Sequence, residues 1–185
     1  AVATQLGALI QRKQMEDTLR IAEERYHSIV ENAVEGIYQA TPSGRLLSAN
    51  PALAKLYGYE SPAALMASLQ DVSQQLYVDP NRRNEFIAAM ETDNAVIEFE
   101  SMIYRKDGEK IWISENARAV RDAHGQLLYY EGTVSNITAR KLAQEALKYQ
   151  KEQTERLLLN ILPKPIAERL QEKPQIIADS FSEVT

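Results

Sequence analysis

The sequence contains no cysteine, and its 185 residues include only two histidines, His27 and His124. The absence of cysteine excludes disulfides, thiolate zinc sites, iron–sulfur clusters, cysteine nucleophiles and cysteine–chromophore adducts. Two histidines cannot form a histidine-rich metal centre, and no apolar run approaches the ~18 residues that a membrane span needs. We therefore expect a cytoplasmic protein without a metal site or a membrane span.

The start of the sequence has no basic segment before its apolar stretch, so we expect no signal peptide and interpret the chain as a segment of a longer protein. The net charge of −5 is concentrated in residues 34–137, which hold nine Lys and Arg against fourteen Asp and Glu. An acidic segment of this kind repels phosphate backbones, and no basic stripe lies elsewhere. Nucleic-acid binding is therefore not expected.

Both ends of the sequence have the composition of long helices. Residues 1–33 contain no proline and a single glycine, and residues 138–162 contain neither. Apolar residues recur there at alternating steps of four and three, which is the repeat of a coiled coil. The predicted seam consists of Ala8, Met15, Leu19, Ala22, Tyr26 and Ile29 in the first helix, and Ala143, Leu147, Leu157 and Ile161 in the last.

Polar residues interrupt both seams: Arg12 in the first, and Gln150 and Thr154 in the second. Polar seam positions fix the register of a coiled coil at some cost in stability. The first seam fits an amphipathic helix lying on its own domain as well as it fits a coiled coil. Pro163 should end the last helix, and a short helix over Pro165–Leu170 should follow.

The middle of the sequence begins with the pattern of a hairpin and two capped helices. Gly36–Ala40 and Arg45–Ala49 flank a Thr-Pro-Ser-Gly turn. Asn50 precedes a proline, which fits a helix N-cap followed by proline at the first helical position. Asp79 also precedes a proline, and we predict a second capped helix from there.

Three strands are predicted next, over Ala95–Lys106, Lys110–Arg121 and Gln126–Ile137, separated by turns that contain Asp107-Gly108 and Gly125. The consecutive large residues Leu127–Tyr130 need cover on both faces of the sheet. The helices between the strands can cover one face. A terminal helix or a partner subunit can cover the other.

These elements carry residues that closely resemble the two halves of a PAS domain. The front half matches at Tyr26, Glu31–Ile37, Gly44-Arg45, Ser48–Ala52 and Gly58-Tyr59, and the back half at Tyr104–Gly108, Trp112, Gly125, Gly132 and Asn136–Lys141. The resemblance implies an α+β fold with a five-stranded antiparallel sheet in the order 2-1-5-4-3. Short helices would cover one face, and long helices would flank the domain, which we place at residues 26–138.

Two further resemblances concern the ends. Residues 1–25 resemble the last helix of a GAF domain leading into a PAS domain as an N-terminal signalling helix. Residues 154–185 resemble the linker that precedes a class III nucleotide cyclase domain, where Val184-Thr185 would begin the first catalytic strand. We therefore expect an output helix that forms a coiled coil over 139–162 and a cyclase linker over 163–185. ATP and Mg²⁺ would bind only in the cyclase domain, outside this chain.

The function implied by these resemblances is a regulatory sensor and dimerisation module that controls a C-terminal adenylate or guanylate cyclase, which is a lyase. The alternative is a PAS sensor that binds a ligand or cofactor and feeds a kinase or phosphatase. The fragment itself is expected to catalyse nothing. Its partners would be a second copy in a parallel homodimer and the adjacent GAF and cyclase domains in cis.

The resemblance also suggests which residues relay the signal: Asn136, Ile137 and Thr138 at the start of the output helix, then Gln150 and Thr154 within it. PAS domains usually have Asp where Asn136 stands, and Asn can cap the helix but cannot form the full ion pair. Asn50 and Asp79 are expected to be structural caps. With no cysteine, and no histidine between Asp79 and Asp93, we expect no haem or flavin adduct and a colourless protein.

Overall fold

The computed structural model describes residues 2–70 and 72–161. The chain divides into two compact units, Ala1–Thr138 and Ala139–Thr185. The first unit begins with the long helix α1 (Val2–Glu31) and continues into the sheet domain. Its strands are β1 (Gly36–Ala40), β2 (Leu46–Ala49), β3 (Ala95–Tyr104), β4 (Lys110–Arg121) and β5 (Leu127–Asn136).

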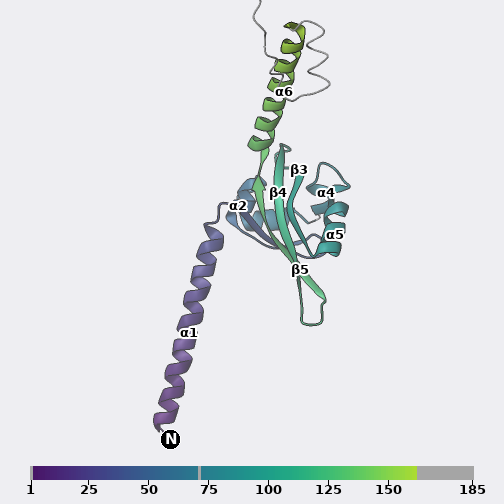
Figure 1. Ribbon diagram of the computed structural model, residues 1–185. Helices are drawn as coiled ribbons and strands as arrows, with labels where there is room; N and C mark the ends of the chain where they lie inside the picture. The colour runs from purple at the N-terminus through teal and green to yellow at the C-terminus, as the bar shows by residue number, and fades with distance from the viewer. Residues whose placement is uncertain (1, 71, 162–185) are drawn as a thin grey trace, which may run out of the picture. The chain divides into compact units, whose positions relative to one another are not determined.

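The five strands form one antiparallel sheet in the order β2-β1-β5-β4-β3, which confirms the predicted topology (Figure 1). The first and last strands are neighbours, because β5 pairs with both β1 and β4. The strand that leaves the domain toward the C-terminus therefore runs through the middle of the sheet. In register, Tyr38 of β1 lies opposite Gly132 of β5, and Glu115 of β4 lies opposite Val134.

Four short helices connect β2 to β3: α2 (Pro51–Leu56), α3 (Pro62–Ser68), α4 (Val72–Gln75) and α5 (Arg82–Asp93). As predicted, Asn50 caps α2, and its side chain accepts a hydrogen bond from the amide of Leu53. Helices α3 and α4 were not predicted from the sequence, although Ser61 before Pro62 repeats the pattern of a capping residue followed by proline.

The predicted helix cap at Asp79 is wrong. Helix α5 begins three residues later, at Arg82, after Asn81. The Asp79 carboxylate accepts a hydrogen bond from the Asn81 amide at 2.9 Å, and the Asp79 carbonyl accepts one from the Arg82 amide. An Asp side chain that binds an amide two residues ahead closes a turn instead of a helix end, so the Asp-Pro pair forms the turn before α5.

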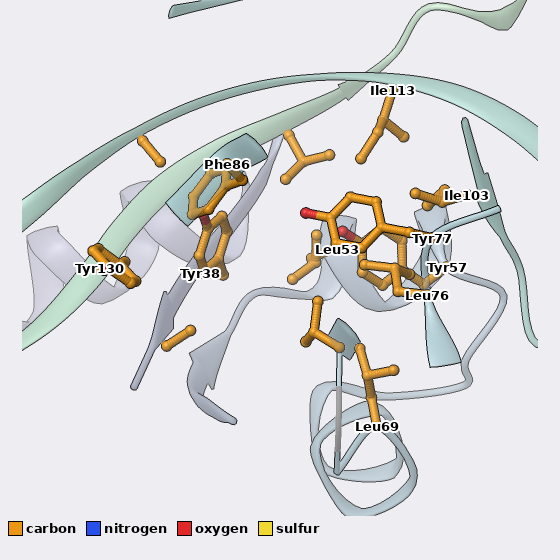
Figure 2. Packing of buried hydrophobic residues seen from close by; sticks show 14 of the residues in the cluster. Tyr38, Leu53, Tyr57, Leu69, Leu76, Tyr77, Phe86, Ile103, Ile113 and Tyr130 are labelled. Atoms are coloured by element: carbon orange, nitrogen blue, oxygen red, sulfur yellow. The ribbon is translucent and has the colours of Figure 1, made fainter. Parts of the chain in front are cut away.

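The hydrophobic core lies between the short helices and one face of the sheet. Helices α2, α3 and α5 contact β1, β2 and β3 respectively. The ring of Phe86 packs edge-on against Tyr130 and Phe99, with centroids 6.0 and 5.7 Å away. Tyr38, Tyr57 and Tyr77 project into the same core (Figure 2). The largest fully buried apolar side chains are Leu53, Leu65, Phe86, Met90, Ile103, Ile113 and Val134.

The opposite face of the sheet carries apolar side chains without cover from the described part of this chain. In the Leu127–Tyr130 run, Tyr130 faces the core and is buried, whereas Leu128 lies at an irregularity in the pairing of β5 with β4 and is 49% exposed. On β3, a bulge follows Val96, and Glu98 takes a left-handed backbone conformation with φ of 51°. The amide of Glu98 donates to the side-chain oxygen of Asn116, and neighbouring Ile97 is 82% exposed. The sheet therefore has one dry face and one open face.

Helix α6 (Thr138–Ile161) begins at the last residue of the first unit, one residue before the predicted output helix, and makes up the described part of the second unit. Twenty-four residues make a helix about 36 Å long. Ion pairs at the helical spacing of four join Lys148 to Glu152 and Lys151 to Glu155, each at 4.0 Å. The predicted helix end at Pro163, the helix over Pro165–Leu170 and the linker lie outside the described residues. Among the helices described, none has the length and apolarity to cross a membrane.

Candidate functional site

The most unusual group in the core is the carboxylate of Glu115. Strand β4 alternates, so that Ile111, Ile113, Glu115 and Ala117 all face the helices and are all buried. Glu115 thus occupies a position where the pattern otherwise places apolar residues, with only 6% of its surface exposed. Ionised carboxylates are rarely buried in this way unless paired. The buried carboxyl group of Glu115 therefore requires polar partners inside the core.

Tyrosine hydroxyls and one guanidinium surround Glu115. Tyr38 on β1 donates a hydrogen bond from its hydroxyl to the Glu115 carboxylate. Tyr57, at the C-terminal end of α2, and Tyr77, just after α4, line the same cavity together with Arg83 of α5. Its volume of about 30 Å³ suits about one or two water molecules. We call Glu115, Tyr38, Tyr57, Tyr77 and Arg83 the interior polar cluster.

Burial dominates the titration behaviour of the cluster. Loss of solvation raises the pKa of Glu115, although the Tyr38 hydrogen bond and the positive charge of Arg83 act in the opposite direction. Burial first, and then the Glu115 charge, raise the pKa of the Tyr38, Tyr57 and Tyr77 hydroxyls. The tyrosines are therefore neutral donors at ordinary pH, and Glu115 is the member of the cluster whose charge state depends on its surroundings.

Glu115→Gln should stabilise the domain above the ordinary carboxyl pKa of 4.5. Folding raises the pKa of Glu115, so between pH 4.5 and the folded pKa the folded state holds a proton that the unfolded state has lost. The stability that Glu115 contributes is therefore complete below pH 4.5 and is lost as the pH rises through the folded pKa. Glutamine stays neutral and still accepts from Tyr38. We expect a gain of about 1–3 kcal/mol at neutral pH, shrinking toward pH 4.5, measured by urea unfolding at several pH values.

The exposed Glu98 on β3 provides a matched control for this measurement. Glu98→Gln removes the same charge from a solvated position and should change the free energy of unfolding by less than about 0.5 kcal/mol at every pH. A Glu115→Gln variant that is less stable than the unmodified chain at neutral pH would show instead that the ionised carboxylate is well compensated.

Three of the five predicted relay residues, Asn136, Ile137 and Thr138, form a compact joint at the start of α6. The Asn136 side-chain oxygen accepts from the Thr138 amide at 2.9 Å, so Asn136 closes a turn onto the first residue of α6, as Asp79 does before α5, and is not the predicted helix cap. The Thr138 hydroxyl accepts from the Trp112 amide at 2.9 Å, and the Ile137 amide donates to the Trp112 carbonyl at 2.9 Å. Ile137 is buried. This joint fixes the end of β5 to the neighbouring strand β4.

A second joint forms around Asn50, which is fully buried and makes four hydrogen bonds. Its side-chain oxygen accepts from the amides of Ile37 and Leu53 at 2.8 and 2.9 Å. Its side-chain amide donates to the carbonyls of Val30 and Glu35 at 3.1 and 2.9 Å. Asn50 was predicted only as a cap, but it also connects the end of α1 to β1.

The predicted seam residues are exposed wherever the structure describes their side chains. Met15, Leu19, Tyr26 and Ile29 on α1 are 61–74% exposed, and Leu147 and Leu157 on α6 are 68% and 61% exposed. Ala22 and Ala143 are also exposed, whereas the side chains of Ala8 and Ile161 fall outside the described part. Gln150 and Thr154 are exposed on α6, where the Thr154 hydroxyl donates to the Gln150 carbonyl at 2.9 Å.

An open groove of about 450 Å³ lies where the end of α1 meets the uncovered face of the sheet. Tyr26 and Val30 line it from α1, and Ile37, Ile97 and Thr133 line it from three strands. His27 and His124 are both exposed. Within the described ranges, no three His, Cys, Asp or Glu side chains gather as a metal site would require.

The residues of the two joints were singled out from the sequence, Asn50 only as a cap, but the interior polar cluster was not predicted. A signal for Glu115 was present, because it continues the period-two apolar pattern of Ile111, Ile113 and Ala117. No comparable signal indicated that Tyr38, Tyr57, Tyr77 and Arg83 would surround it, since these residues come from four different segments.

Comparison with known proteins agrees with this architecture. The sensor histidine kinase TmoS of Ectopseudomonas mendocina is 24% identical over 139 residues, which are 73% of this chain and 14% of that protein. An RNA-binding light-oxygen-voltage receptor has a TM-score of 0.58 at 23% identity, over 72% of this chain and 38% of that one. A PAS domain from Colwellia psychrerythraea has a TM-score of 0.54 at 21% identity, over 64% and 98%.

These solved structures establish the fold, and the chain spans a small part of the curated relative. The family profile described as PAS domain matches residues 34–139, which covers all five strands and all four short helices. The same range contains the interior polar cluster and most of both joints. The chain therefore belongs to the PAS domain family, whose members act as sensory and regulatory modules in signal transduction.

Proposed function

We propose that this chain is the regulatory segment of a class III nucleotide cyclase and relays signals from its PAS domain to the catalytic domains. The observation that carries the proposal is the joint at Trp112 and Thr138, which ties the sheet to the start of α6. That helix runs into residues 154–185, which resemble the cyclase linker. Residues 138–172 contain no histidine that could accept a phosphoryl group in a kinase linker.

A second candidate output is a histidine kinase, favoured by the likeness to a protein named as a sensor histidine kinase. The two outputs leave different products. The parent protein incubated with labelled ATP should release cyclic AMP, or cyclic GMP when GTP is supplied. Formation of an acid-labile phosphoprotein without any cyclic nucleotide would identify the kinase and contradict the cyclase proposal.

We further propose that the chain forms a parallel homodimer, with GAF and cyclase domains as its neighbours in cis. The exposed seams of α1 and α6 support this proposal, because large apolar side chains in a heptad repeat are stable in water when a second helix covers them. The uncovered face of the sheet, where Ile97 is exposed, supplies further apolar surface.

Light scattering at tens of micromolar should therefore report a dimer. Leu147→Lys places a charge in the α6 seam and should weaken the dimer by at least tenfold in Kd, since it buries an unpaired charge at the interface. Gln144→Lys adds the same charge three residues earlier, outside the predicted seam, and should leave the mass unchanged. A monomer at this concentration, or antiparallel crosslinks, would contradict the proposal.

A further inference from the structure

The hydrogen bond between Tyr38 and Glu115 crosses a strand. Tyr38 lies on β1 and Glu115 on β4, and β5 runs between them. At the crossing, β5 presents Gly132, where an added Cβ would lie 2.4 Å from the carbonyl oxygen of Asn116. Next along the core face comes Val134, which is completely buried. The two polar groups thus bridge the strand that continues into the output joint.

The carboxyl group offers different bonds in its two charge states. A neutral carboxylic acid has an O–H to donate, whereas a carboxylate only accepts. The neutral acid is compatible with a closely packed cluster, and burial of Glu115 favours it. An ionised Glu115 instead attracts Arg83, the cationic group of the cluster, and draws water toward the cavity of about 30 Å³.

Arg83 has other partners that its movement would disturb. Its guanidinium donates to the carbonyl of Pro42 at 3.4 Å and lies 5.1 Å from the ring centre of Phe86, and Arg83 lines the same cavity as Tyr77. A change in the charge of Glu115 would therefore act on α5 and the β1–β2 turn through Arg83, and on β1 through Tyr38. On β4 itself, Glu115 lies three residues from Trp112, which holds Ile137 and Thr138.

We propose that Glu115 and Tyr38 form a proton-controlled switch across β5, in which the neutral acid holds the packed core and the carboxylate recruits Arg83 and water. The groups that face Glu115 are Tyr38 from β1, Tyr57 from the end of α2, Tyr77 from the segment after α4 and Arg83 from α5. Its biological meaning rests on the relay role proposed above. The switch itself is a property of the PAS domain and is testable in this chain alone.

A pH titration of the chain from 4.5 to 9 at constant ionic strength tests the switch, with near-ultraviolet circular dichroism reporting tyrosine packing. Infrared spectroscopy reports the carbonyl stretch of a protonated carboxylic acid. Both signals should change together, with a midpoint above 4.5. Glu115→Gln should abolish the transition, whereas Glu98→Gln, on the exposed part of β3, should retain it.

Tyr38→Phe distinguishes a switch from a merely structural glutamate. Without the Tyr38 hydroxyl, the Glu115 carboxylate loses a hydrogen bond that stabilises its charge. The midpoint of the pH transition should therefore rise by about one to two pH units. If the circular dichroism signal of Glu115→Gln changes at the same pH as that of the unmodified chain, the proposal is wrong. An infrared acid band that is absent throughout, or one that persists unchanged to pH 9, would also overturn it. If Glu115→Gln does not fold, the infrared titration of the unmodified chain decides by the same criteria, independently of any output domain.

Discussion

Replacing Asn50 by alanine should remove a large part of the stability of the PAS domain. The substitution deletes four hydrogen bonds and leaves the amides of Ile37 and Leu53, and the carbonyls of Val30 and Glu35, without their partner. A hydrogen bond contributes about 1 kcal/mol net, and buried groups left unpaired cost more. We expect a loss of about 3–6 kcal/mol, which is a large part of the total of about 5–15 kcal/mol for a typical domain, measured by urea unfolding.

Two further variants serve as comparisons for Asn50→Ala. Asn81 also precedes a helix, but it is exposed and makes no side-chain cap bond. Asn81→Ala should therefore cost less than about 0.5 kcal/mol. Asn50→Asp keeps the two acceptor bonds and loses the two donor bonds, so its loss should be intermediate. Equal unfolding midpoints for Asn50→Ala and Asn81→Ala would contradict the role assigned to the buried amide.

Inserting one residue after Glu152 should severely change the regulated activity of the parent protein, whereas inserting seven should preserve much of it. One residue rotates the distal half of α6 by about 100° and lengthens it by about 1.5 Å. Seven residues nearly restore the rotational phase, because the seam repeats every seven. The output domain would therefore receive an altered signal only from the single insertion, measured as nucleotide turnover across the insertion series.

Two substitutions in the seam sharpen this test. Gln150 and Thr154 are its polar layer, and changing both to Leu should strengthen the coiled coil and hold the parent in one output state. The competing explanation is that residues 139–162 act as a tether that only sets local concentration. A tether would tolerate one added residue as well as seven and would not respond to the Leu substitutions. Equal regulation across the series would exclude the helical relay.

The local elements of this protein were predictable because their signals are short in range. Proline after Asn50 placed the start of α2, and glycines with positive φ, such as Gly108 and Gly125, mark the turns between the last strands. The bounds predicted for β4 agree with the observed strand, because alternation persists over its twelve residues. The same reasoning failed at Asp79, where a turn and a helix cap share one sequence pattern.

Only the tertiary structure decided which residues became partners. Glu115 contacts Tyr38, which lies 77 positions away, because the order of strands brings β1 and β4 to the two sides of β5. Asn50 binds the end of α1 because the pairing of β2 with β1 returns the chain to residues 30–37. Sequence periodicity specifies which face of an element is buried. The charge state and the partners of a buried group depend instead on every segment that the fold packs around it, and no local pattern carries that information.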